Sequence, residues 1–214
     1  MSSENPHLAE PLRRLGAPAG PAGLGAVLVH GRGQDTDFMA AVAARVGMPD
    51  VHCVLPAAAG SSWYPGRFMD DVETNEPWLT HALAAVDAAL SELASEGYPP
   101  ERVVLMGFSQ GACLLAEHLV RHPRPYAAVA LLTGGYIGPE GVERIPGGAL
   151  PRTPVLLSSS RTDEWVPPGR VRETAALLEA MGAAVTLSIH EAPEHGVDDD
   201  EVRAVRSLLD SAGS

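Results

Sequence analysis

The sequence is poor in cysteine and in positive charge, and both shortages narrow what the protein can be. Cys53 and Cys113 are the only cysteines in 214 residues, which excludes a disulfide scaffold and favours a reducing compartment. Fifteen basic residues against 27 acidic ones give a formal net charge of −12. That charge argues against a nucleic-acid partner and against docking on an anionic membrane surface.

Long apolar runs are also missing. Residues 1–16 hold no apolar stretch that could form the core of a signal peptide, and no segment approaches the roughly 20 apolar residues of a membrane-spanning helix. We therefore expect a cytoplasmic protein. A content of 45% hydrophobic and 20% charged residues is ordinary for a globular protein, and the length suits one core.

The N-terminal segment differs in composition from the rest of the chain. Residues 16–23 form a Pro/Gly/Ala tract without hydrophobic periodicity. We expect residues 1–24 to be a flexible arm, ending in at most a short edge strand, and residues 25–214 to form a single domain.

Beyond the arm, strand patterns alternate with helix patterns. Strands are predicted at 26–30, 51–55, 102–106, 127–132, 154–158 and 184–190, and helices at 38–46, 77–93, 110–122, 169–181 and 198–208. Nearly continuous apolar runs such as 127–132 are typical of strands that are buried on both faces. The pattern predicts an α/β protein with three layers and a mostly parallel sheet of six or seven strands, whose ligand sites lie at the carboxyl ends of the strands. The Gly/Pro-rich stretch 133–152 is too short for a large cap domain.

The strongest motif is Gly107-Phe-Ser-Gln-Gly111, which follows a predicted strand and precedes a predicted helix. A turn from strand to helix within one residue strains the backbone at Ser109 and exposes its hydroxyl. Side chains at Gly107 and Gly111 would collide with the neighbouring elements. The motif predicts a serine nucleophile of the α/β-hydrolase type, against the alternative of a glycine-rich turn that happens to contain a serine.

A serine hydroxyl needs a base, and the base needs an acid to orient it. In this architecture the order along the chain is serine, acid, histidine. Of the eight histidines, His190 and His195 follow the candidate acids, and the loop position of His195 favours it. Asp163 and Glu164 both lie in the loop after the fifth predicted strand, and their positions alone leave the choice of acid open.

The loops around this serine suggest the rest of a site. The amide of Gln110 and one amide from the glycine-containing loop 30–35 are the expected donors to an oxyanion. Trp63, Phe68 and Trp165 lie in loops on the active side and are candidate walls of a substrate pocket, although core packing explains each of them equally well.

Two further features are explained by ordinary structural roles. Cys113 lies one helical turn after the serine, where a buried apolar filler is expected. A dense group of His190, Glu191, Glu194, His195 and Asp198–Asp200 offers metal ligands, but the acids 198–200 are better explained by the positive end of the last helix. We expect no metal.

Several short segments together resemble the phospholipase/carboxylesterase family of α/β hydrolases, which includes bacterial carboxylesterases and acyl-protein thioesterases. The resemblance covers the chain from about residue 26 onward, and its carriers are Val29-His-Gly-Arg-Gly33, Trp63-Tyr-Pro65, Gly107-Phe-Ser-Gln-Gly111, Asp163-Glu-Trp-Val-Pro167 and His195-Gly-Val197. It implies a small hydrolase without a cap, a metal or a cofactor. It selects Asp163 over Glu164, supports His195, and assigns the oxyanion donors to Arg32 and Gln110. Ser160 occupies a position where the family usually has glycine. The backbone geometry of the loop that carries Asp163 is therefore expected to depart from the family's pattern.

These observations lead to one expected function and two alternatives. We expect a serine carboxylesterase that hydrolyses small to medium carboxylic esters through an acyl-enzyme on Ser109. An acyl thioesterase or lysophospholipase would use the same triad, and a non-catalytic binding module on a hydrolase scaffold is the alternative of another class. The expected partner is a small-molecule ester, with no nucleic acid or membrane, and a homodimer is compatible with the sequence.

Overall fold

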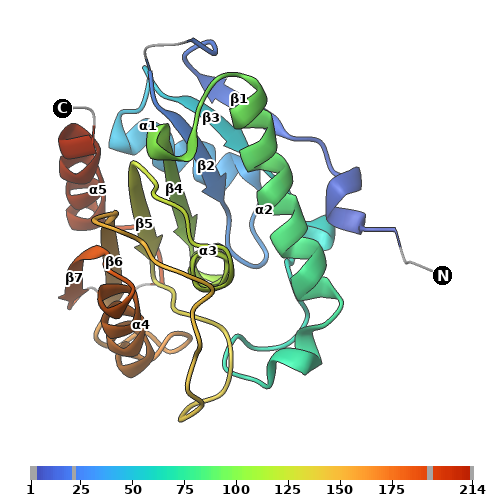
Figure 1. Cartoon of the computed structure of the whole chain (residues 1–214), viewed down its shortest axis with the longest axis vertical. Helices are drawn as coiled ribbons and strands as arrows, with labels where there is room; N and C mark the ends of the chain where they lie inside the picture. Colours follow the sequence, from blue (N-terminus) through green and yellow to red (C-terminus); the bar gives the residue numbers. More distant parts are fainter. Residues whose placement is uncertain (1–3, 21–22, 192–194, 213–214) are drawn as a thin grey trace.

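A computed structural model describes residues 4–20, 23–191 and 195–212 of the chain, and in it a single sheet is enclosed between two layers of helices (Figure 1). The strands are β1 (Arg13–Gly16), β2 (Gly25–Val29), β3 (His52–Leu55), β4 (Val103–Phe108), β5 (Ala128–Leu132), β6 (Pro154–Ser160) and β7 (Ala184–His190). The α-helices are α1 (Thr36–Val46), α2 (Trp78–Ser95), α3 (Gln110–Arg121), α4 (Pro168–Ala180) and α5 (Asp199–Ala212). Short 3₁₀ helices lie at Pro6–Ala9, Ala59–Ser61, Val72–Asn75 and Pro100–Arg102.

The sheet is parallel except at one edge. Its strand order is β1-β3-β2-β4-β5-β6-β7, and only the β1–β3 pair is antiparallel among the described strands. The prediction of a mostly parallel α/β sheet is therefore confirmed. The six parallel strands end at a common edge, so the loops that follow β2, β4, β6 and β7 are brought together there.

Both faces of the sheet are covered, and β2 shows why its sequence is uniformly apolar. Val27 and Val29 pack into a core shared with α2, α3 and α4, whereas Ala26 and Leu28 pack into a second core shared with α1 and α5 (Figure 1). Successive side chains of a strand point to opposite faces, and here each face has a helical layer to meet.

The segment expected to be an arm differs from that expectation. Within residues 4–20, the 3₁₀ helix Pro6–Ala9 places His7 in the interior, and β1 pairs with β3 in register from Arg13 with Leu55 onward. The edge strand also ends at Gly16, where the Pro/Gly/Ala tract begins, instead of after the tract. Only Leu15 is a large apolar residue in β1, so no hydrophobic period marked this strand in the sequence; pairing with β3 creates it.

The connection from β5 to β6 contains no helix or strand in residues 133–153, which agrees with the absence of a cap domain. Its backbone instead closes against neighbouring elements, as where the Gly138 amide donates to the carbonyl of Phe68 at 2.8 Å. Among the described residues, no helix has both the length and the apolar character that a bilayer crossing requires.

Candidate active site

The turn between β4 and α3 presents Ser109 at the carboxyl edge of the sheet. Its backbone is strained, with φ 52° and ψ −119°, a region that residues other than glycine rarely adopt. The Ser109 amide donates to the carbonyl of Leu132 on the neighbouring strand at 2.9 Å, which holds the turn against β5.

The two glycines of the motif are required by their surroundings. A Cβ at Gly111 would lie 2.2 Å from the carbonyl oxygen of Val29 and 2.5 Å from that of His30. A Cβ at Gly107 would lie 2.7 Å from the carbonyl carbon and oxygen of Gly111. Both distances are far below van der Waals contact, so the close packing of α3 against β2 and β4 explains both glycines.

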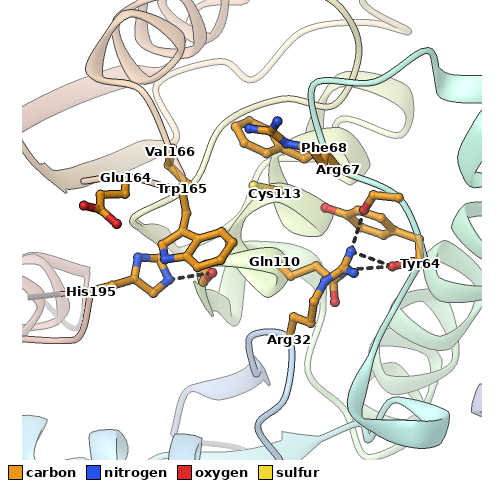
Figure 2. Close-up of a pocket in the computed structure, with 12 residues that line it drawn as sticks. Arg32, Tyr64, Arg67, Phe68, Gln110, Cys113, Glu164, Trp165, Val166 and His195 are labelled. Atoms are coloured by element: carbon orange, nitrogen blue, oxygen red, sulfur yellow. Dashed lines mark hydrogen bonds between the residues drawn. The ribbon is translucent and has the colours of Figure 1, made fainter. Parts of the chain in front are cut away.

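Three side chains from three loops meet at this turn. The Oγ of Ser109 lies 2.9 Å from Nε2 of His195 (Figure 2). Nδ1 of His195 lies 2.7 Å from Oδ2 of Asp163. Asp163 follows β6 and His195 follows β7. This geometry suits an imidazole that donates its Nδ1–H to the carboxylate and accepts the serine O–H at Nε2.

Asp163, and not Glu164, is the acid that the structure brings to the histidine. Its second oxygen, Oδ1, accepts the backbone amides of Trp165 at 2.9 Å and Val166 at 2.7 Å. One carboxylate therefore orients the imidazole and shapes its own loop. Glu164 lies at the edge of the adjoining cavity.

His190 lies apart from this relay. Its Nδ1 is 3.5 Å from Oδ2 of Asp198 and its Nε2 is 3.5 Å from Oε1 of Glu201. The two acids cap α5 reciprocally, because Asp198 Oδ1 accepts the Glu201 amide at 2.7 Å and Glu201 Oε2 accepts the Asp198 amide at 3.0 Å. The proposed explanation of the acids by the helix end holds for Asp198.

The wider metal-ligand group is not assembled as the sequence grouped it. Among the described residues, His190, Asp198 and Glu201 are the one group of three or more whose potential ligand atoms all lie within 4.8 Å of one another. His195 is engaged with Ser109 and Asp163, and Glu191 forms an ion pair with Arg161 at 2.6 Å. Glu194 lies outside the described residues.

The loop after β2 and the start of α3 carry the two backbone amides that the sequence assigned to an oxyanion. In the loop after β2, the amide of Gly31 donates to Oε1 of Gln34 at 2.9 Å and that of Gly33 to the carbonyl of Ser61 at 2.7 Å. The intervening amide of Arg32 has no acceptor among the described residues. A Cβ at Gly31 would lie 3.1 Å from the Cβ of Ser109, so this loop adjoins the serine directly. The amide of Gln110 begins α3.

The side chains of Arg32 and Gln110 hold the loop that the sequence assigned to the pocket. Gln110 Oε1 accepts the amide of Trp63 at 2.9 Å, and its Nε2 donates to the carbonyl of Tyr64 at 2.8 Å. The guanidinium of Arg32 donates to the carbonyls of Tyr64, Pro65 and Gly66 (Figure 2). Sequence reasoning used only the amides of these two residues.

A cavity of about 670 Å³ opens beside the serine and histidine. Phe68 and Trp165 line it, as predicted, and Trp165 is 67% exposed at its mouth. Residues that sequence reasoning did not assign to the cavity are Tyr64, Gly66, Arg67, Cys113, Glu164 and Val166. Most of them are close neighbours of Phe68, Trp165 or Ser109 in the chain, and that adjacency was the available signal.

The prediction that Trp63 walls the pocket was wrong. Its side chain is fully buried, and its indole Nε1 donates to the carbonyl of His30 at 2.8 Å. The ring lies between those of His7 and His30, at centroid distances of 5.4 and 5.0 Å. Trp63 therefore anchors the loop in the core, while its neighbour Tyr64 contributes to the cavity.

Cys113 has the buried structural character that the sequence suggested, and His30 also has a structural role. Burial raises the pKa of the Cys113 thiol to about 12, so the thiol stays protonated at neutral pH and is a poor nucleophile. Burial also lowers the pKa of His30, whose Nδ1 donates to the carbonyl of Gly31 and whose Nε2 accepts the amide of Ala58. Both residues support the loops around Ser109.

Comparisons with known proteins indicate a single family. Residues 15–212 match the family model described as Phospholipase/Carboxylesterase. A solved phospholipase/carboxylesterase from Dyadobacter fermentans superposes with a TM-score of 0.88 at 34% identity, covering 92% of this chain and 95% of that one.

Two curated proteins are more distant. A probable carboxylesterase of Oryza sativa subsp. japonica is 25% identical over 161 residues, which is 75% of this chain and 56% of that protein. An acyl-protein thioesterase 1 of Cryptococcus neoformans var. neoformans is 27% identical over 124 residues, 50% of this chain and 52% of that protein. The chain thus spans about half the length of the curated relatives it matches.

Proposed function

Because this chain belongs to the phospholipase/carboxylesterase family of α/β hydrolases, we propose that it is a serine carboxylesterase that hydrolyses small to medium carboxylic esters through an acyl-enzyme on Ser109. The observation that carries the proposal is the continuous relay from Asp163 through His195 to Ser109, with separations of 2.7 and 2.9 Å. The two distances allow the donor–acceptor order that general-base activation of a hydroxyl requires.

In the acylation step, Nε2 of His195 takes the proton of the Ser109 hydroxyl while Oγ forms a bond to the ester carbonyl carbon. Asp163 stabilises the resulting imidazolium and keeps the ring in the orientation that leaves Nε2 toward the serine. The carbonyl oxygen becomes an anion that the amides of Arg32 and Gln110 stabilise. When the tetrahedral intermediate collapses, the bond to the alcohol oxygen breaks and the imidazolium returns its proton to the leaving alcohol.

Deacylation repeats the sequence with water in place of the serine. His195 takes a proton from the water as its oxygen adds to the acyl carbon, and then returns it to Oγ of Ser109 as the carboxylic acid leaves. The open cavity beside the two residues gives water access to the acyl-enzyme. The same base serves both halves of the cycle, so no second titrating group is needed.

An acyl thioesterase is the second candidate, favoured by the similarity to an acyl-protein thioesterase. A lysophospholipase would use the same side chains. A thiolate leaves more readily than an alkoxide, so a thioester depends less on protonation of the leaving group by the imidazolium. The two activities can therefore be distinguished with substrates that share an acyl chain and differ in the leaving group. Paired ester and thioester substrates of equal acyl length rank them directly.

The proposal is tested with a series of 4-nitrophenyl esters of two to eight acyl carbons and with covalent labelling by a fluorophosphonate. We expect turnover and labelling in the native protein and neither in Ser109→Ala. Cys113→Ala serves as the matched control, because it removes the nearest other nucleophile and should still label. Full turnover by Ser109→Ala would refute the assignment.

A non-catalytic binding module predicts a different outcome of the same experiment. Folded protein would then show neither labelling nor turnover across the whole series, although the cavity would still bind the esters. Circular dichroism of the same sample establishes that the protein is folded, so a negative result is assigned to function.

A further inference from the structure

Two arginines line the cavity beside Ser109 without a carboxylate partner. Neither Arg32 nor Arg67 takes part in an ion pair in the described parts of the chain, although acidic residues outnumber basic ones by 27 to 15. An uncompensated guanidinium in a cavity attracts an anion. Arg32 and Arg67 differ in whether their guanidinium groups already form hydrogen bonds within the protein.

Three hydrogen bonds to backbone carbonyls hold the guanidinium of Arg32 in place. Its guanidinium donates to the carbonyl oxygens of Tyr64 and Pro65 at 2.8 Å and of Gly66 at 2.5 Å. These acceptors are neutral, so they satisfy its donors without cancelling its charge. Arg32 therefore adds a fixed positive field to the cavity but has little capacity to bind a substrate group directly.

Arg67 has a fixed backbone and a free side chain. Its amide donates to Oδ2 of Asp70 at 2.7 Å, and its carbonyl accepts Nδ2 of Asn75 at 3.0 Å. Asn75 is fully buried and also accepts the amide of Gly66 at 2.8 Å, which anchors this turn to the core. The exposed guanidinium of Arg67 forms no hydrogen bond within the described residues, so its five donors are available to a ligand.

Charged side chains of opposite sign lie on opposite sides of the cavity. Figure 2 shows Arg67 and Phe68 across the cavity from Trp165 and His195. Glu164, the one acid of the lining, lies on the side of His195. The lining also includes Tyr64, Phe68, Trp165 and Val166, whose apolar surface suits an apolar linker between a reacting ester and an anionic end.

Building on the proposed esterase activity, we propose that Arg67 is a specificity-determining residue that selects esters carrying a carboxylate at the end of an apolar acyl chain or aromatic alcohol. The guanidinium matches a carboxylate in a bidentate geometry.

The test compares esters that differ only in this charge. Mono(4-nitrophenyl) adipate is paired with its methyl-capped neutral counterpart, and 4-acetoxybenzoate with its methyl ester, so that the anion sits on the acyl side in one pair and on the alcohol side in the other. In Arg67→Gln we expect the ratio of kcat/KM for the anionic over the neutral ester to fall about tenfold or more in at least one pair, mainly through KM.

Two variants control for charge in general. Arg172→Gln removes an exposed arginine on α4 outside the cavity lining and should leave the ratio unchanged. Arg67→Lys keeps the charge without the planar fork and should recover only part of the ratio. An equal effect of Arg67→Gln and Arg172→Gln would overturn the proposal.

Binding separates this proposal from the proposed esterase activity. In Ser109→Ala protein, calorimetry should show tighter binding of the carboxylate ester than of its methyl ester, and Arg67→Gln in that background should abolish the difference. Equal binding of the two esters would refute anion selection even in an active esterase. A preference that depends on Arg67 in a protein without turnover would uphold the binding role and refute the esterase.

Discussion

The carboxylate side chain of Asp163 is 1% exposed, whereas the imidazole of His195, which it contacts at 2.7 Å, is 27% exposed. The acid is thus held inside the protein and the base stands at the border of the cavity. Because its two oxygens are shared between His195 and the amides of its own loop, the position of the acid depends little on solvent.

We predict that Asp163→Asn folds normally but lowers kcat by about 10³- to 10⁴-fold, because an amide NH₂ toward His195 favours the tautomer that cannot accept the serine proton. The amide oxygen can still bind the loop amides of Trp165 and Val166. Steady-state kinetics and thermal unfolding of the same preparation measure both effects. Glu164→Gln makes the same chemical change next to it, and a comparable loss there would contradict the assignment of the acid.

The second prediction concerns the glycine at which α3 crosses β2. Gly111→Ala should reduce the free energy of unfolding by about 3 kcal/mol, the upper end of overpacking costs, because the new Cβ meets two backbone carbonyl oxygens that cannot rotate away. Gly169→Ala is the matched control. Nothing lies within 4 Å of a Cβ there, and alanine in α4 should raise stability by up to about 1 kcal/mol. Urea denaturation measures the free energy of unfolding of both variants. Similar values for the two would contradict the packing argument.

The elements whose sequence patterns are local could be predicted from the sequence alone. The apolar run of β5 and the Gly-x-Ser-x-Gly turn each carry their structure in consecutive residues, and the structure has both. β1 was not readable in this way, since Arg13–Gly16 becomes a strand only by pairing with β3. The reciprocal cap of Asp198 and Glu201 was readable from its three-residue spacing, yet only the acids 198–200 were considered.

The pocket was harder to predict because the direction of a loop side chain is decided by distant contacts. Trp63 and Tyr64 are adjacent and aromatic, and nothing local tells which of them faces the cavity. The carbonyl of His30, 33 residues away, captures the indole of Trp63. Arg67 was missed because a charged loop residue is most often solvated, and its significance depends on the lack of an ion-pair partner for its guanidinium among the described residues.

The third prediction is a loss of stability in mild acid that arises from His7 and His30. Burial lowers the pKa of both below the ordinary value of 6.5, and both accept a backbone amide on a ring nitrogen, from Ala59 and Ala58 respectively. The unfolded chain therefore takes up protons first as the pH falls through 6.5, and the free energy of unfolding falls with it. Above that pH the two histidines add no pH dependence.

Urea denaturation between pH 5 and pH 8 measures this slope. His7→Gln, at the edge of the core, should flatten the part of the slope between pH 5 and pH 6.5 relative to the native protein. His81→Gln, on α2, removes a histidine outside this pair and should leave the slope in place. Identical slopes in the native protein and in His7→Gln would exclude His7 as a source.

The last prediction has the opposite sign and concerns Glu201, in the first turn of α5. Its side chain is almost fully buried, and burial raises its pKa above the ordinary value of 4.5. The folded protein therefore holds the proton more tightly than the unfolded chain, and stability is lost as the pH rises from about 4.5 through the folded-state pKa. Glu201→Gln keeps an oxygen for the Asp198 amide and removes the buried charge. We expect it to unfold at a higher urea concentration than the native protein at pH 7, with the gain shrinking toward pH 4.5. A variant that is less stable at pH 7 would instead mean that the ionised carboxylate, through His190, holds the start of α5 in place.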